Sequence, residues 1–438
     1  MGMSKTDLVK GMRQLGFKNI IEDFQDQDKT WQDLGVPEDL IYSLKSLKMD
    51  RPSKIQAQAL QSIPHIQKNQ LYQAANGSGK TLAFGVPSLM RVDPSIDSVQ
   101  VLIIANTREL NRQIQAMIQK VAEKTKIVVG LGDRELTEKG THIIVASPQW
   151  IASRLGGKTA INLKALKMVV FDEADEIFFQ PANRPLITKL LAHTKKLNLQ
   201  VQGILFSATF PKEVLETVLA VFQDPEMMIN LVKKECLQLK GVKQFKILKE
   251  YYRAFDAKTQ REQEDCYKEE FIREVYDSIQ ESQTMIFVNM KPTAEKLQTK
   301  LKEIGIVAHI LINKMDKAER DRVIDDFRKQ SITCLICTNV LARGIDVPEV
   351  DLVINYDVPI INFCGWKEPD IPNYLHRIGR TGRFGTDGVA LSIYSDEAEH
   401  DALHAIQDYY EVKIKNISSV QELKFVLDKM RNRDVDDD

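Results

Sequence analysis

The sequence has few cysteines, no long apolar run and almost no net charge, and each absence excludes a class of protein. Its five cysteines are an odd number at irregular spacings, so a disulfide framework is not expected. No apolar run approaches the ~20 residues of a membrane-spanning helix. Residues 1–10 lack the apolar segment of a signal peptide. We therefore expect an intracellular chain with no membrane insertion.

Charge balance and cysteine spacing narrow the classes of partner further. Lysine and arginine number 60 and aspartate and glutamate 61. This balance argues against a protein that binds polyanions through a basic tail, but it leaves room for a local basic groove. Cys334 and Cys337 have the spacing of half a zinc site, yet no second pair follows them. They lie in an apolar run, where free cysteine acts as a small hydrophobic residue, so core packing is favoured over zinc.

The length of 438 residues exceeds one ordinary hydrophobic core and suggests two domains of roughly 200 residues. Short apolar segments alternate with helical stretches in both halves. The segments are residues 99–105, 126–129, 142–146, 168–171 and 201–206, and then 285–288, 307–312, 332–336, 352–354 and 389–393. This alternation predicts an α/β protein with two domains, each a mostly parallel sheet covered by helices. The expected parts are an N-terminal extension (1–30), a first domain (31–231), a linker (232–242) and a second domain (243–438).

A phosphate-binding loop is indicated where an apolar strand around Leu71 runs into Gly77-Ser78-Gly79-Lys80-Thr81. Glycines let backbone N–H groups close around phosphates, Lys80 supplies positive charge, and the Thr81 hydroxyl is placed to reach Mg²⁺. Ala74 stands at the first glycine of the generic pattern. The alternative is a glycine turn that merely precedes a helix, and the order of residues after the strand favours the phosphate loop.

Acidic and hydroxyl side chains end two other apolar segments. Residues 168–171 run directly into Asp172, Glu173 and Asp175, and residues 201–206 run into Ser207-Ala208-Thr209. Carboxylates at the tip of a buried strand are costly unless a positive charge lies beside them. A magnesium ion carrying a nucleotide is one such charge, and a strand that ends in an acidic surface turn is the alternative. Ligands bind at this edge of a parallel sheet.

The second half concentrates its arginines around glycines. Residues 376–383 place His376, Arg377, Arg380 and Arg383 around two glycines, and residues 342–346 add a further arginine and Asp346. Arginine suits planar, charge-assisted binding of phosphate. A solvated basic helix face is the alternative, although glycines are poor helix formers. An arginine finger from the second domain would make hydrolysis depend on domain closure.

Taken in order, these motifs resemble the DEAD-box RNA-dependent ATPases, and the resemblance runs from Trp31 to about Asp408. The matching segments are Gln56 with the upstream Trp31, 74–81, 107–110, 172–175, 207–209, 342–346 and 376–383. The resemblance implies two tandem RecA-like domains and an RNA helicase that uses ATP and Mg²⁺ to remodel RNA or RNA–protein complexes. In residues 51–56, 239–244 and 368–375 the sequence is similar in particular to the mRNA-export members of the family, which work at the cytoplasmic face of the nuclear pore.

The family pattern also implies roles for individual residues. The nucleotide contacts would be Trp31 on adenine, Gln56 at its edge, Gly77, Ser78, Gly79, Lys80 and Thr81 at the phosphates, and Asp346 at the ribose. Thr81 and Asp172 would hold the metal. The catalytic residues would be Glu173, acting on water, with Lys80, Arg380 and Arg383. Asp175, Ser207, Thr209 and His376 would couple the nucleotide to RNA, whose backbone would contact Arg108, Ser147 and Thr338.

The resemblance further implies partners and a place in the cell. RNA would be bound with weak sequence preference, and the other partners would be nuclear pore proteins and an export activator that uses inositol hexakisphosphate. The protein would be a monomer of the cytoplasm and nucleus. Two other functions remain open. One is an ATP-gated RNA clamp with slow turnover. The other is a DNA-translocating helicase of the same architecture, which would lack the preference of an RNA helicase for strands with 2′-hydroxyl groups.

Some positions depart from the family pattern on the RNA side. Asn106 stands where the family has Pro, and Gln149-Trp150 stand where it has Gly-Arg. One cationic phosphate contact should therefore be missing. Trp150→Arg would then tighten RNA binding, unless Trp150 is a packing residue, in which case the change would cost stability.

Overall fold

The computed structural model describes most of the chain. The described residues are 5–22, 29–74, 77–133, 136, 139–156, 160–231, 241–248, 268, 271–277, 283–312, 315–338, 350–363, 366–382, 388–410 and 412–436. They form two compact units, Lys5–Leu237 and Gln238–Asp438. Among the described residues, no helix has both the length and the apolar character needed to cross a bilayer.

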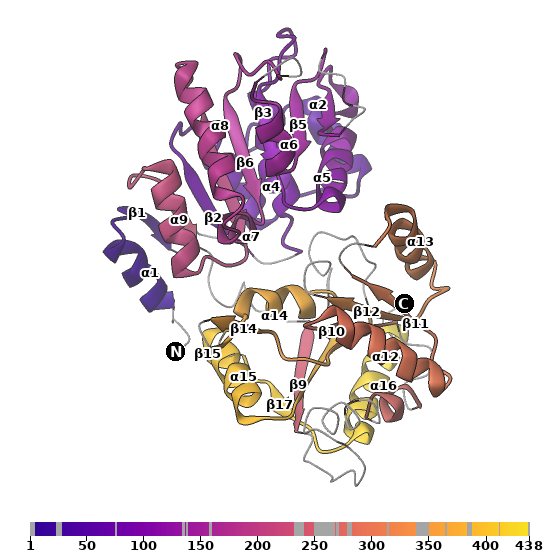
Figure 1. Ribbon diagram of the computed structural model, residues 1–438. Coiled ribbons are helices and arrows are strands. Elements are labelled where there is room, and N and C mark those ends of the chain that lie inside the picture. Colours follow the sequence, from indigo (N-terminus) through magenta and orange to yellow (C-terminus); the bar gives the residue numbers. More distant parts are fainter. Residues whose placement is uncertain are drawn as a thin grey trace. The chain divides into compact units, whose positions relative to one another are not determined.

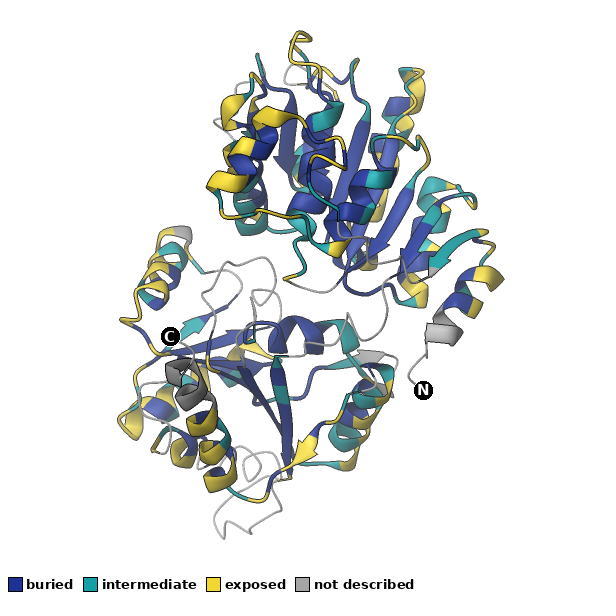
Figure 2. Cartoon of the chain, turned by 180° about the vertical axis from the view of Figure 1, so that it is seen from behind, coloured by how far each residue is buried: buried dark blue, intermediate teal, exposed yellow. Residues whose placement is uncertain are grey.

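The first unit is built on a parallel sheet of eight strands in the order β1-β8-β2-β7-β6-β3-β5-β4 (Figure 1). The strands are β1 (Asn19–Glu22), β2 (Gln70–Gln73), β3 (Val101–Ile104), β4 (Val129–Leu131), β5 (Ile143–Ala146), β6 (Met168–Asp172), β7 (Gln202–Ser207) and β8 (Met228–Leu231). The five residues of β6 are all buried. Figure 2 shows the central strands in the colour of buried residues, as expected for strands covered on both faces.

Helices connect these strands and cover the sheet. They are α1 (Lys5–Gln14), α2 (Glu38–Ser46), α3 (Lys54–Ser62), α4 (Lys80–Arg91), α5 (Arg108–Val121), α6 (Pro148–Ser153), α7 (Ala174–Phe179), α8 (Arg184–Lys196) and α9 (Lys212–Phe222), with a 3₁₀ turn at Ala122–Lys124. The start of α5 is fixed by Thr107, whose side chain accepts a hydrogen bond from the Leu110 N–H. Ser147 caps α6 in the same way.

Residues 5–22 belong to the first unit. β1 pairs in parallel with β8, from Asn19 opposite Met228 to Glu22 opposite Leu231. The Asn19 side-chain amide donates to the Glu226 carbonyl at 2.8 Å, and Phe17 is buried. Sequence analysis predicted only an N-terminal extension here, because a four-residue strand at a sheet edge has too little alternation to be recognised.

The second unit has a parallel sheet in the order β11-β12-β10-β13-β16-β9-β17 and a separate antiparallel hairpin. The sheet strands are β9 (Val242–Leu248), β10 (Thr284–Val288), β11 (Ala308–Leu311), β12 (Cys334–Thr338), β13 (Leu352–Asn355), β16 (Gly388–Tyr394) and β17 (Lys415–Asn416), and the hairpin is β14 (Ile360–Phe363) with β15 (Trp366–Pro369). The helices are α12 (Lys291–Glu303), α13 (Lys317–Arg328), α14 (Ile371–Ile378), α15 (Glu397–Tyr410) and α16 (Val420–Asp436). The prediction of two α/β units with parallel sheets is confirmed.

Cys334 and Cys337 both lie on β12 with buried side chains. Burial raises the pKa of the Cys334 thiol to about 12 and that of Cys337 further. Among the described residues there is no group of three or more side chains suited to hold a metal ion. Because both side chains are fully buried, Cys334 and Cys337 contribute to the packing of the second sheet.

Candidate functional site

Three neighbouring strands of the first sheet bring the predicted nucleotide residues together. β2, β7 and β6 are adjacent, with Gln73 opposite Ser207 and Asp172 opposite Phe206. The phosphate loop follows β2, the carboxylates follow β6, and the hydroxyls follow β7. All three segments therefore begin at the same edge of the sheet, where ligands of open parallel sheets bind.

The phosphate loop is held by its own backbone and by Gln56. Lys80 is the first residue of α4, and its ammonium donates to the Ala74 carbonyl at 3.2 Å. Gly79 has a φ of +90°, which favours glycine. A Cβ built on Gly79 would lie 2.4 Å from the Gln56 amide nitrogen, so a side chain there would displace Gln56. Gly77, Ser78 and Thr81 are described around this turn, whereas residues 75 and 76 lie outside the described residues.

Gln56 is buried at the third position of α3 and links that helix to the loop. Its side-chain oxygen accepts from the Ser53 N–H at 2.8 Å, and its side-chain nitrogen donates to the Gly79 carbonyl at 3.1 Å. Ser53 donates from its hydroxyl to the Ser78 carbonyl at 2.8 Å. This segment can therefore sense the conformation of the loop.

Trp31 lies in the hydrophobic core of the first unit, 1% exposed. Its indole N–H donates to the Met49 carbonyl at 2.9 Å. The ring has no exposed face in this conformation, so its placement does not support the predicted stacking on adenine. It instead fixes the segment that leads to Ser53 and Gln56.

The carboxylate segment stores electrostatic and backbone strain. Asp172 is 4% exposed. Burial raises the pKa of its carboxyl to about 7; the Lys80 charge opposes this shift and the Glu173 charge adds to it. Glu173 has a φ of +50°. This backbone conformation costs a non-glycine residue on the order of 1–3 kcal/mol, and residues that adopt it are often found at functional sites. Its Oε2 atom is buried and has no hydrogen-bond partner among the described residues. Both carboxyls are suited to a cation or water that the nucleotide would bring.

A hydrogen bond connects the carboxylate segment to the hydroxyl segment. The Thr209 hydroxyl donates to Asp175 Oδ2 at 2.6 Å, and both side chains are buried. The Thr209 N–H donates to the Ser207 hydroxyl at 3.3 Å, and the Ser207 carbonyl accepts from the Ala74 N–H at 2.9 Å. A short bond to a carboxylate is strong in a buried site. The three segments are therefore mechanically joined.

The predicted RNA residues of the first unit lie at helix starts. Arg108 is exposed at the first position of α5, and Ser147 is the half-buried N-cap of α6. β3 and β5, which lead into these helices, are neighbours in the sheet. Trp150 is half-buried: its indole N–H donates to the Asp133 carbonyl at 3.2 Å, and the Arg154 guanidinium lies 5.2 Å from its ring centre.

The second unit places its basic residues near the ends of β10, β12 and β13. His376 is buried in α14, Arg380 is 6% exposed after it, and Thr338 is 7% exposed at the end of β12. The charge of Arg380 acts on the Cys337 thiol, which precedes Thr338. Arg383 and Asp346 lie outside the described residues.

Sequence reasoning did not separate Arg377 from its neighbouring arginines. Its side chain is 0% exposed and donates to the Asp357 carbonyl and to Asn289 Oδ1, each at 2.6 Å, and to Asn355 Oδ1 at 3.3 Å. Asn289 follows β10 and Asp357 follows β13. Arg377 therefore anchors α14 to the sheet and is not directed at a ligand, a difference that no local sequence signal reveals.

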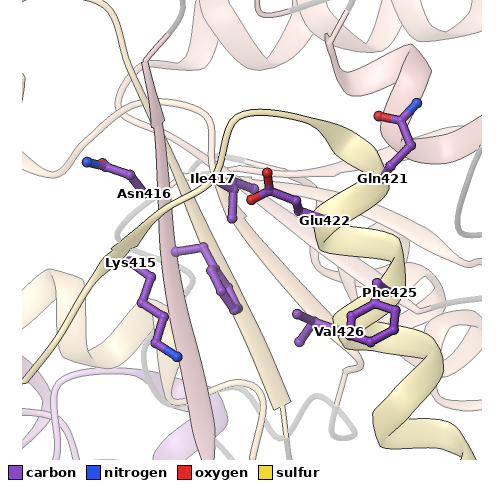
Figure 3. A pocket seen from close by; sticks show the side chains of 8 residues that line it. Lys415, Asn416, Ile417, Gln421, Glu422, Phe425 and Val426 are labelled. Atoms are coloured by element: carbon purple, nitrogen blue, oxygen red, sulfur yellow. The ribbon is translucent and has the colours of Figure 1, made fainter.

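A hollow of about 450 Å³ lies elsewhere on the second unit, beside β9 and β17 (Figure 3). It is lined by Phe245, Lys415, Asn416, Ile417, Gln421, Glu422, Phe425 and Val426. None of the predicted site residues is among them.

Comparison with known proteins gives consistent matches along the chain. The DEAD/DEAH box helicase model matches residues 53–218, and the helicase conserved C-terminal domain model matches residues 267–385. The ATP-dependent RNA helicase DBP5 of Candida albicans is 36% identical over 387 residues, covering 87% of this chain and 68% of that protein.

Solved structures of similar proteins agree with the fold. S. cerevisiae Dbp5 bound to RNA and ADP BeF3 has a TM-score of 0.79 and 32% identity, covering 92% of this chain and 99% of that one. A variant of S. cerevisiae Dbp5 bound to Nup159, Gle1, IP6 and ADP has a TM-score of 0.62 and 30% identity, covering 91% of this chain and 100% of that one.

Proposed function

Because the chain belongs to the DEAD-box family of ATP-dependent RNA helicases, we propose that it remodels RNA or RNA–protein complexes through RNA-stimulated ATP hydrolysis by its two RecA-like domains. The observation that carries the proposal is the meeting of phosphate loop, carboxylates and hydroxyls on three adjacent strands of the first sheet. The hydrogen bond between Thr209 and Asp175 supports a mechanical link between the hydroxyl segment and the carboxylate segment.

The first domain binds the nucleotide. The phosphates are held by the Lys80 ammonium and by backbone N–H groups of the loop at Gly77, Ser78 and Gly79. This loop combines a positive charge with the N-terminus of α4. Gln56 connects α3 to the loop through its hydrogen bond to the Gly79 carbonyl. Bound ATP draws the Lys80 ammonium away from the Ala74 carbonyl, and a change in the loop reaches α3 through the bonds of Gln56 and Ser53.

Asp172 and Thr81 are the residues that would hold Mg²⁺. The buried carboxyl of Asp172 with its raised pKa fits a cation, because a neighbouring positive charge would offset the cost of its burial. When bound, the ion neutralises phosphate charge. Glu173 orients and deprotonates the attacking water, which suits its unpartnered Oε2.

The second domain completes the reaction. Arg380 and Arg383 stabilise the charge that develops on the γ-phosphate, as arginine fingers do, and Asp346 holds the ribose. Arg377 positions this motif through its buried bonds. Turnover therefore requires both domains, and Asp175, Ser207, Thr209 and His376 couple turnover to RNA.

RNA is held by its sugar–phosphate backbone at Arg108, Ser147 and Thr338. The exposed start of α5 offers the Arg108 guanidinium, and Ser147 at the start of α6 offers a hydroxyl, whereas Pro148 contributes no N–H. Backbone N–H groups and helix starts can position phosphates without a large net charge on the protein. This mode of binding is weakly selective for sequence.

The biological role that we propose is mRNA export at the cytoplasmic face of the nuclear pore. The similarity to S. cerevisiae Dbp5 in complex with Nup159, Gle1 and IP6 supports partners of these kinds for this chain. Acceleration of RNA-stimulated ATP turnover by Gle1 with IP6 is the test of this part. The alternative, an ATP-gated RNA clamp, binds RNA with ATP but turns over slowly.

Glu173→Gln tests the enzymatic core of the proposal. We expect ATP and RNA binding to persist while turnover falls about 10²- to 10⁴-fold, because the amide cannot accept the proton from water. Steady-state ATP hydrolysis with saturating RNA, beside filter binding of RNA in the presence of ATP, measures both quantities. Near-normal turnover in the variant would remove Glu173 from the reaction, and a wild type unresponsive to RNA would overturn the function.

A further inference from the structure

A buried asparagine joins the two helix starts of the RNA edge to the carboxylate helix. Asn183, which precedes α8, is 0% exposed. Its side-chain nitrogen donates to Asn106 Oδ1 at 3.1 Å and to the Ile177 carbonyl at 3.2 Å. Its side-chain oxygen accepts from the Gln149 amide at 2.9 Å. We call these three amides, Asn106, Asn183 and Gln149, the amide hub.

Apart from a weaker bond of 3.4 Å to Gln180 Oε1, the partners of Asn183 lie where position matters for RNA or nucleotide. Asn106 immediately precedes Thr107, the cap of α5, and Gln149 is the second residue of α6. Ile177 belongs to α7, which begins directly after Asp172 and Glu173. α6 and α8 lie side by side (Figure 1) and are also joined by a bond of 3.2 Å from the Lys189 ammonium to the Ala152 carbonyl.

We propose that Asn183 is a positioning residue that couples RNA binding at the starts of α5 and α6 to α7. The inference rests on the proposed RNA-stimulated ATPase and adds a residue to it. Through the hub, a phosphate that settles on Arg108 or Ser147 acts on the helix that carries Asp175. The hub thus sets how much RNA is needed to accelerate hydrolysis.

The exposure of the partners separates this role from simple packing. Gln149 is exposed and Asn106 half-buried, so water can replace Asn183 as their partner. Loss of the hub therefore releases the two helix starts without leaving both amides unsatisfied. The effect falls mainly on the relative position of α5, α6 and α7.

The test is the RNA dependence of ATP hydrolysis in the full chain with Asn183→Ala. We expect the RNA concentration for half-maximal stimulation to rise about three- to tenfold, the size of one net hydrogen bond, because water replaces Asn183 at the accessible Gln149 and Asn106 amides. The rate at saturating RNA changes less. Asn230→Ala is the matched control, because Asn230 is also 0% exposed and is bonded away from α5, α6 and α7: it donates to the Leu71 carbonyl at 3.3 Å and accepts from Gln58 of α3 at 3.2 Å. ATP binding without RNA, measured for the same variant, shows whether the bond to α3 affects the nucleotide.

Gln149→Ala tests the same link at an exposed side chain and protects the test against a misfolded Asn183→Ala. In the Asn183→Ala background its effect should be smaller than additive, because both changes remove the same bond, that between Gln149 and Asn183. An equal shift in Asn230→Ala, or no shift with Asn183→Ala and Gln149→Ala, would overturn the hub alone. A wild type without RNA stimulation would overturn the proposed function and the hub together.

Discussion

Asp172 illustrates at the scale of a single residue how the site stores unfavourable charge. Its carboxyl is enclosed at the end of β6, and its pKa of about 7 lies well above the ordinary value of 3.8. The folded chain therefore holds a proton that the unfolded chain releases near pH 4. As pH rises from about 4 to about 7, this group lowers the free energy of unfolding, by at most about 1.4 kcal/mol per unit of pKa shift.

Asp172→Asn should therefore raise the melting temperature of the nucleotide-free protein. The gain should increase from pH 4 to pH 7 and level off above that, because Asn carries no charge to desolvate. Differential scanning calorimetry between pH 5 and pH 8 measures it. A gain that is the same at both pH values would show that the buried charge is not the cause.

Individual residues also show what sequence could and could not predict. Lys80, Asp172 and Thr209 could be placed because each follows an apolar strand, and parallel strands end at one edge of a sheet. Trp31 could not, since an aromatic residue before a helix can face the core or a ligand. Asn183 and Arg377 carried no signal, because their partners are distant in the chain and the bonds exist only in the folded structure.

At the scale of elements, most strands predicted from apolar runs were found, but residues 126–129 overlap β4 only at Val129, and several short strands were missed. Residues 168–171 and 285–288 are long enough apolar runs to identify buried strands. β1, β14 and β17 are short and mixed, and their pairing depends on neighbours far away in sequence. The helix starts at Thr107 and Ser147 are local features, because a hydroxyl caps each of them.

β16 makes a close contact with the turn that follows Arg380. A Cβ on Gly388 would lie 2.0 Å from the Thr381 hydroxyl and 2.5 Å from the Gly382 backbone nitrogen. Gly388→Ala should therefore displace the arginine motif, with overpacking of about 1–3 kcal/mol. We expect RNA-stimulated ATP hydrolysis to fall severalfold and the melting temperature to drop by several degrees. Gly156→Ala is the control, because nothing lies within 4 Å of its Cβ; equal losses in both variants would contradict the explanation.

At the scale of the whole molecule, the region matched to the helicase models begins at residue 53, yet the first unit begins at Lys5. Removing residues 1–28 would take away β1 and expose the edge of β8. An unpaired strand edge is a template for association with other chains. We expect the shortened protein to be less soluble and to melt at a lower temperature, as measured by sedimentation and calorimetry.

Lys18→Ala is the comparison for that truncation. It removes only the ion pair with Glu226, at 2.6 Å between largely exposed side chains, which contributes less than about 1 kcal/mol. Full solubility of the shortened protein would mean that β8 tolerates an open edge.

The pairing of β1 with β8 also has a consequence for how the protein is made. Asn19 and Glu226, which bond across this edge, are 207 residues apart in the chain. A ribosome adding about 5–20 residues per second needs roughly 10–40 s to synthesise that interval. Within its sheet, β1 is thus made before the other strands, and its partner β8 is made after all of them. During this delay β1 has no native strand to pair with, and a chaperone at the tunnel exit has time to bind it.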